Sequence, residues 1–274
     1  MLKLMYITND VQIAQIVEKN GVDRVWVDLE TKGKKERQFG MNTVQSTHTI
    51  TDVKKIRDCL SGKADLIVRI NPVYDGTENE INEVIKYGAD IIMLPYYKSI
   101  EEVESFLDIV DKRAKTCLLL ETIAAEKCLD DTLRLFAANI DEIHIGLNDL
   151  HLEYGLKFMF ELLSNGKVEE IVNKIKAYDI QYGFGGIAKL DEGLLPARHV
   201  IAEHYRLGST MAIVSRSFYD SWISNDYIEI ERTFKYGVGQ IRDFERRLYY
   251  ENESFFENNR KTVIREVEQV INHI

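Results

Sequence analysis

Two carboxylates in this chain follow short apolar runs, where an α/β protein often places its chemistry. Glu121 comes directly after the run 116–120, and Asp149 comes three residues after the run 143–146. Each run has the length of a strand and precedes a helix pattern. If the two strands are parallel neighbours, both carboxylates emerge at the same carboxyl-terminal edge of the sheet. Carboxylate oxygens there, with room for water and substrate, suit a hard divalent cation such as Mg²⁺.

Other charged residues end strand-like runs at the same predicted edge. Asp28 and Glu30 end the second run, and Arg69 ends the third. Charged groups against buried strands cost desolvation free energy unless they are paired or bound to a metal. Each has an ordinary explanation by itself: Arg69 can pair with Asp28 or Glu30, and Asp149 can cap the helix that follows it. All five together favour a functional site.

Short apolar runs alternate with longer amphipathic ones through most of the chain. Several runs are almost entirely apolar, as expected of strands covered by helices on both faces. Eight strands alternating with helices over roughly 210 residues predict a (β/α)₈ TIM barrel of the α/β class. A doubly wound open sheet is the alternative. The predicted strands are 2–7, 24–29, 64–70, 90–94, 116–120, 142–145, 180–184 and 205–207, and the predicted helices lie near 10–19, 51–60, 77–87, 99–113, 125–138, 167–177 and 191–202.

The pattern changes after Tyr219. Residues 226–250 repeat apolar positions at helical spacing, and a second helix is expected from Ser254. Both carry more apolar surface than a solvated tail tolerates. We therefore expect a catalytic TIM-barrel domain, residues 1–220, and a C-terminal helical extension, residues 221–274, that packs on a neighbouring subunit. Packing on the chain's own barrel is the alternative.

Composition narrows the function classes. The net charge of −10, from 45 acidic and 35 basic residues, argues against a nucleic-acid partner. No apolar run approaches the ~18 residues of a membrane span, and the first residues do not form a signal peptide. Three cysteines do not make a disulfide framework, and Cys117 is expected to be a buried thiol. We expect a cytoplasmic protein without a membrane partner.

The motifs, in this order, resemble those of the HpcH/HpaI aldolase and citrate lyase beta-subunit family. The resemblance covers roughly residues 20–215 and rests on an ordered set of motifs: Gly21-Val22-Asp23, Val27–Glu30, Val68–Asn71, Gly88–Pro95, Leu120–Thr122 and Ile145–Leu150. It implies a TIM barrel that binds pyruvate, phosphoenolpyruvate or a related keto acid. It also implies that a carbon–carbon bond is made or broken through an enolate.

Carried over by position, the resemblance implies a role for each strand-end residue. Glu121 and Asp149 would ligate Mg²⁺ or Mn²⁺. Arg69 would face the keto oxygen and stabilise the enolate. Glu30 would form a hydrogen bond to a water on the metal. The resemblance also suggests a homo-oligomer, a trimer or a hexamer.

Two glycines after the seventh predicted strand are further candidates. Gly185 and Gly186 would let the backbone come close to a substrate, because glycine carries no Cβ. A tight strand-to-helix turn explains them equally well.

The chain departs from the aldolase pattern in the loop after the second strand. Aldolase members often carry a histidine directly after the acidic residue, where this chain has Thr31. His48 in the same loop is the candidate replacement as acid/base, and a solvated loop histidine is the alternative. His144 alternates with apolar residues and is expected in the core or an interface. The loop 31–48 also carries Lys32, Lys34, Lys35 and Arg37, which could attract a phosphate, a carboxylate or a coenzyme A tail. A solvated lid is the other interpretation.

The main hypothesis is a divalent-metal-dependent carbon–carbon lyase that forms a pyruvate-like enolate from a keto acid. One alternative is a citrate-lyase-like enzyme with a coenzyme A thioester substrate. The other is a non-catalytic carboxylate-binding barrel. A Schiff-base aldolase needs a lysine that projects from a strand into the barrel mouth, and the predicted strands offer none.

Overall fold

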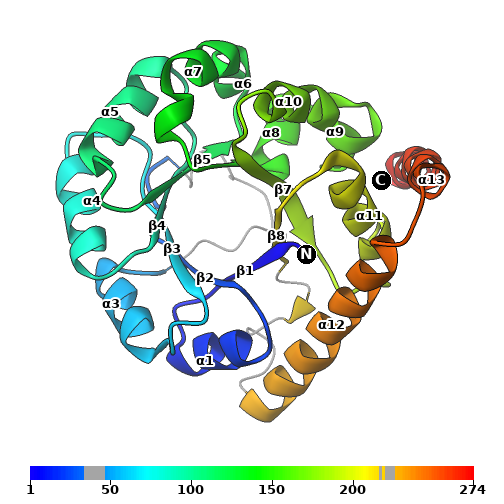
Figure 1. The fold of residues 1–274 in the computed structure, drawn as a ribbon, viewed down its shortest axis with the longest axis horizontal. Coiled ribbons are helices and arrows are strands. Elements are labelled where there is room, and N and C mark those ends of the chain that lie inside the picture. Colours follow the sequence, from blue (N-terminus) through cyan, green and yellow to red (C-terminus); the bar gives the residue numbers. More distant parts are fainter. Residues whose placement is uncertain (34–46, 216–217, 220–225) are drawn as a thin grey trace.

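A computed structural model describes residues 1–33, 47–215, 218–219 and 226–274. In these residues eight parallel strands close into a barrel in sequence order, with helices around the outside (Figure 1). The predicted TIM barrel is confirmed, and an open sheet is excluded because the first strand pairs with both the second and the eighth. The strands are β1 Lys3–Ile7, β2 Arg24–Asp28, β3 Asp65–Arg69, β4 Ile91–Leu94, β5 Lys115–Leu120, β6 Glu142–Ile145, β7 Gln181–Ile187 and β8 Met211–Val214.

The helices form where apolar residues recur at helical spacing, and several begin at a side chain that caps the first turn. Asp10, Ser99 and Asn252 each accept a hydrogen bond from a backbone N–H of the helix that follows. The helices are α1 Val11–Lys19, α3 Ile50–Cys59, α4 Thr77–Lys86, α5 Ile100–Val110, α6 Ile123–Lys127, α7 Leu129–Phe136, α8 Leu147–Glu153, α9 Glu161–Ser164, α10 Lys167–Lys176, α11 Ala197–Leu207, α12 Tyr227–Leu248 and α13 Glu253–His273, with a 3₁₀ helix, η1, at Ala137–Asn139.

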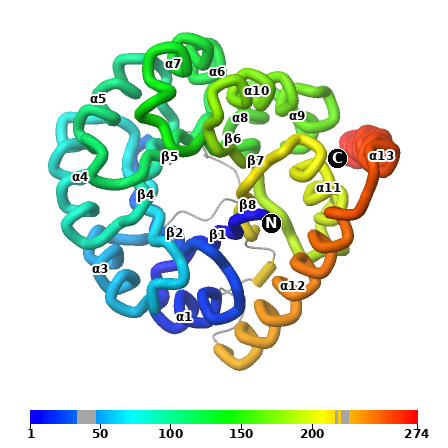
Figure 2. Tube along the Cα trace, viewed as in Figure 1, coloured from blue at the N-terminus to red at the C-terminus, as the bar shows by residue number. Residues whose placement is uncertain are grey.

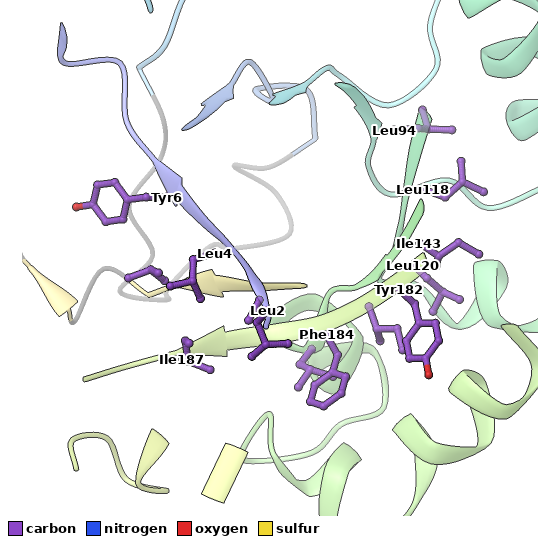
Figure 3. Close-up of a cluster of buried hydrophobic side chains, with 14 of the residues drawn as sticks. Leu2, Leu4, Tyr6, Leu94, Leu118, Leu120, Ile143, Tyr182, Phe184 and Ile187 are labelled. Carbon is purple, nitrogen blue, oxygen red and sulfur yellow. The ribbon is translucent and has the colours of Figure 1, made fainter. Parts of the chain in front are cut away.

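Side chains alternate along each strand between the helix layer and the barrel interior. Leu118, Leu120 and Ile143 belong to the outer layer, part of which Figure 3 shows. A separate cluster fills the interior: Met5, Trp26, Ile67, Ile91, Met93, Cys117, Leu119 and Met211. Asp28, Arg69 and Glu121 each stand two residues after one of these interior residues. Because the side-chain period of a strand is two, they point to the barrel axis at its carboxyl-terminal end.

A buried ion pair lies at the opposite end of the barrel, where β2 and β6 begin. Arg24 on β2 donates to both carboxylate oxygens of Glu142 on β6, at 2.6 and 2.5 Å. Arg24 has no exposed surface, and the carboxylate supplies the charge that burial requires. This pair is structural and lies away from the site at the strand ends.

One predicted strand is wrong. Residues 205–207 form the last turn of α11, and the eighth strand is Met211–Val214. The helix ends because Gly208 adopts a left-handed conformation with φ of 72°, a typical glycine helix terminus. Of residues 205–207 only Leu207 is fully buried, on the inner face of the helix, which extends five residues beyond the predicted end at 202.

α12 takes the place of the eighth barrel helix, between α11 and α1 (Figures 1 and 2). Leu2, just before β1, donates its N–H to Glu245 Oε1 at 2.6 Å, and Arg242 donates to the Leu2 carbonyl at 2.7 Å. The domain boundary expected at residue 220 therefore separates α12 from the barrel on which it packs. Of the long helices in the described ranges, α13 alone lies outside the ring, against α11 and α9. Contact of either helix with a neighbouring subunit stays a prediction.

Two other expectations concern the chain as a whole. The cysteines are free, and Cys117 is buried inside the barrel, where burial raises the pKa of its thiol well above the usual range. Among the helices of the described ranges, none has the length and apolar character needed to cross a membrane.

Candidate active site

Arg69 is held at the mouth of the barrel by two carboxylates. Its Nε and Nη2 atoms donate to the two oxygens of Asp28, both at 2.8 Å, and Nη1 lies 3.3 Å from Glu30 Oε2. Burial alone would lower the pKa of the guanidinium, but the charges of Asp28, Glu30 and Glu121 raise that pKa well above its ordinary value. The side chain keeps 11 % of its surface exposed, and the two carboxylates fix the position of its positive charge. Both suggested ion pairs of Arg69 exist, and they orient this charge.

Glu121 is buried beside a backbone donor and a glycine. Its Oε1 accepts the N–H of Tyr96 at 3.0 Å. A Cβ at position 146 would lie 2.7 Å from Glu121 Cβ and 2.9 Å from Oε2, so the carboxylate occupies space that only a glycine leaves open. Tyr96 itself has a left-handed φ of 49°. A residue with a Cβ adopts this conformation at a cost of about 1–2 kcal/mol, so other contacts must hold it there.

Asp149 lies in the first turn of α8, half-buried. The suggestion that it caps a helix starting at Leu150 is wrong, because α8 begins at Leu147 and its N-cap is Gly146. Gly146 is thus the link between the two carboxylates. It touches Glu121 and precedes Asp149 by three residues along the chain.

The donor set at this end of the barrel fits a hard divalent cation. Glu121 and Asp149 supply carboxylate oxygens, the ligands that Mg²⁺ and Mn²⁺ prefer, and the glycine leaves room for one of them. Within the described ranges no group of three or more histidine, cysteine, aspartate or glutamate side chains could hold a metal ion. Two protein carboxylates would leave the other positions to water and substrate, which is usual for Mg²⁺.

Asn71 fixes the start of the loop after β2. Its Oδ1 accepts the N–H groups of Thr31 and Lys32, both at 3.0 Å, and the Thr31 hydroxyl at 3.4 Å. Its Nδ2 donates to Glu80 Oε1 at 2.8 Å, and burial raises the pKa of that carboxyl. The Lys32 ammonium lies 4.2 Å from the ring centre of Tyr74. The remaining basic residues of this loop, Lys34, Lys35 and Arg37, lie outside the described residues.

His48 lies beside the end of β2, half-buried. Its Nδ1 accepts the N–H of Asp28 at 3.0 Å, which assigns the ring proton of the neutral imidazole to Nε2. The structure thus places His48 next to a residue that orients Arg69. Its role as acid/base stays a prediction.

A family model described as HpcH/HpaI aldolase/citrate lyase matches residues 4–180, more than half of the chain. The chain belongs to this family. Membership supports a lyase-type enzyme, and HpcH/HpaI members generally depend on divalent metals. No functionally curated protein matches the sequence.

Solved structures resemble this barrel at low sequence identity. RipC from Yersinia pestis aligns with a TM-score of 0.55 at 14 % identity, over 86 % of this chain and 95 % of that one. An HpcH/HpaI aldolase/citrate lyase family protein from Burkholderia cenocepacia J2315 aligns with a TM-score of 0.60 at 10 % identity, over 88 % of this chain and 94 % of that one. At such identities the likeness concerns the fold alone.

Of the two candidate glycines of β7, Gly185 has a packing explanation within the HpcH/HpaI barrel and Gly186 does not. Gly185 has a φ of 54°, and a Cβ there would lie 2.8 Å from Leu147 Cδ1, so this glycine seats the first residue of α8. A Cβ at Gly186 would make ordinary contacts, 3.5 Å from the Ile213 carbonyl. Contact of either glycine with a substrate stays a prediction.

His144 is a core residue, as its alternation with apolar neighbours predicts. It has no exposed surface, and burial lowers the pKa of its imidazole to about 3. It therefore stays neutral at physiological pH.

Sequence reasoning assigned no role to three residues that shape this site: Tyr96, Gly146 and Asn71. The glycine between a strand run and a helix start was a usable signal. The sequence gives no signal for the left-handed conformation of Tyr96, because tyrosine has no preference for that conformation.

Proposed function

We propose that this protein is a divalent-metal-dependent carbon–carbon lyase that acts on a keto acid through a pyruvate-like enolate. The observation that carries this proposal is the fixed Arg69 guanidinium, which shares the barrel mouth with the buried carboxylate of Glu121. A cation held by Glu121 and Asp149 would supply Lewis-acid polarisation of the keto oxygen.

Arg69, its two carboxylate partners and His48 would then have separate roles. Asp28 and Glu30 hold the Arg69 guanidinium in one orientation, so its charge is in place before negative charge develops on the substrate oxygen. Such preorganised donors are typically worth about 3–4 kcal/mol of the barrier. His48 is the proposed proton carrier, in the loop where aldolases of the family use a neighbouring histidine.

Exchange of the pyruvate methyl protons in D₂O, followed by NMR, tests this function. We expect exchange with Mg²⁺ or Mn²⁺, none with chelator, and none in Glu121→Gln or Asp149→Asn. Asp131→Asn is the matched control, since Asp131 also lies in a first helical turn but is exposed on α7. Full exchange in both site variants would refute the proposal. Tight Mn²⁺ binding with no turnover of any keto acid would favour a non-catalytic barrel.

A coenzyme A thioester is the second candidate substrate, and Thr31 in place of the aldolase histidine is compatible with it. The Thr31 hydroxyl and N–H both contact Asn71, so this residue serves to fix the loop where aldolases carry the histidine. Coenzyme A that competes with substrate at micromolar to millimolar concentration would support the thioester. Unchanged kinetics at saturating coenzyme A would exclude it.

The protein is also proposed to be a cytoplasmic homo-oligomer, trimeric or hexameric, without nucleic-acid or membrane partners. The acidic net charge of −10 supports the absence of nucleic acid.

A further inference from the structure

Glu153, at the end of α8, joins two loops at the mouth of the barrel. Its Oε1 accepts the hydroxyl of Tyr96 at 3.1 Å, and its Oε2 accepts the N–H of Ile123 at 2.7 Å. Tyr96 lies in the loop after β4 and Ile123 opens α6 after β5. One exposed carboxylate therefore links three consecutive strand-to-helix connections.

Both loops that Glu153 touches also contact or carry Glu121. The N–H of Tyr96 donates to Glu121 Oε1 at 3.0 Å, and the Thr122 hydroxyl donates to the Tyr97 carbonyl at 2.8 Å. Tyr96 makes the first of these bonds with a left-handed φ of 49°. The tyrosine side chain is tied to Glu153 at its far end, so this bond resists return of the backbone to an ordinary conformation.

The same helix carries the other candidate metal ligand. Asp149 and Glu153 stand four residues apart on α8, and residues at this spacing share one helix face. A shift of α8 would therefore move Asp149 and the anchor of Tyr96 together.

We propose that Glu153 is a positioning residue: it holds Tyr96 left-handed and so aligns the Glu121 carboxylate with Asp149 for the cation. This inference rests on the proposed metal site and assigns the residues that preorganise it. Groups that orient metal ligands commonly change metal affinity roughly 10–100-fold when removed.

Mn²⁺ affinity of the full chain, measured by calorimetry without substrate, tests the proposal. We expect Tyr96→Phe and Glu153→Ala each to raise the Mn²⁺ dissociation constant roughly tenfold. The double variant should bind no more weakly than Glu153→Ala alone, because Tyr96→Phe removes a bond that Glu153→Ala already removes. Tyr154→Phe is the matched control: it also removes a tyrosine hydroxyl that donates to a carboxylate, but that carboxylate is Glu126, which is not a proposed metal ligand.

Tyr96→Gly separates positioning from simple packing. Glycine adopts a left-handed φ without the cost of a Cβ, so we expect this variant to bind Mn²⁺ more tightly than Tyr96→Phe and to be insensitive to added Glu153→Ala. A side chain needed only for packing would give the opposite order, with glycine the weakest, and would overturn the proposal. Wild-type affinity in both Tyr96→Phe and Glu153→Ala would also overturn it. Failure of the wild-type chain to bind Mn²⁺ would instead refute the metal site itself.

Discussion

Gly146 packs directly against the carboxylate of Glu121, across two neighbouring strand ends. A Cβ at residue 146 would come within 2.9 Å of Glu121 Oε2, closer than such atoms approach in real structures. The glycine therefore sets where one proposed ligand lies and also begins the helix that carries the other, Asp149.

Gly146→Ala should displace Glu121 and weaken Mn²⁺ binding roughly 10–100-fold. Gly239→Ala is the control, because a Cβ there meets nothing and alanine favours the helix interior. Calorimetric titration of both variants checks this. An affinity of Gly146→Ala equal to that of the control would contradict the proposed site.

Asp28→Asn should slow turnover while leaving Mn²⁺ affinity within a few-fold of wild type. An amide cannot accept both donors of Arg69, so the guanidinium loses its fixed direction. We expect kcat to fall on the order of 10–100-fold, with the metal titration as the second readout. Asp65→Asn is the matched control, since Asp65 faces Arg24 at the other end of the barrel. Equal effects of the two variants would speak against a role for Asp28 at the site.

His144 makes folding stability depend on pH. Burial lowers the pKa of both His144 and His204 from 6.5 to about 3. Above pH 6.5 both histidines are neutral in the folded and in the unfolded chain, so they do not lower the free energy of unfolding. Between pH 6.5 and 3 only the unfolded chain binds the proton, so each histidine lowers stability by about 1.4 kcal/mol per pH unit as the pH falls.

Urea unfolding at pH 7, 6 and 5 tests this pH dependence. His144→Leu should flatten the fall in stability by about 1.4 kcal/mol per pH unit relative to wild type. Parallel pH profiles for the two proteins would show that His144 is protonated in the folded state.

Glu245→Ala should destabilise the barrel by about 3 kcal/mol. This buried carboxylate accepts hydrogen bonds from Leu2, Tyr205 and Arg242, and its loss leaves these donors without that acceptor. Glu229→Ala, on the exposed start of the same helix, should change stability by less than about 0.5 kcal/mol. Urea unfolding compares the two. Similar small losses would mean that α12 is not part of the barrel's own framework.

Removal of α13 should lower the oligomeric state, if this helix contacts a neighbouring subunit as predicted. A chain that ends after Glu251 keeps the ring of barrel helices intact and so isolates the effect of α13. Light scattering gives the mass. An unchanged oligomer of this shortened chain would rule out assembly through α13.

The sequence by itself determined the barrel and the edge of it where the candidate site residues lie. Strand and helix periods are local properties, so alternation along the chain sufficed to place seven of the eight strands close to their observed positions. The eighth failed because Tyr205 and Leu207, the alternate positions of a short strand, lie in the last turn of α11. Glu121 and Arg69 stood out because a charge at the end of a buried strand is costly anywhere, and Asp149 because it follows such a strand within a few residues.

Only the tertiary structure decided how these residues are held. Three contacts hold them: Arg69 with Asp28, Gly146 with Glu121, and the N–H of Tyr96 with Glu121. Each joins residues at least 25 positions apart in the sequence. Likewise α12 became a barrel helix through its bonds to Leu2 at the other end of the chain. The local sequence pattern predicts which face of a helix or strand is buried. Closure of the barrel decides which distant residue each side chain contacts.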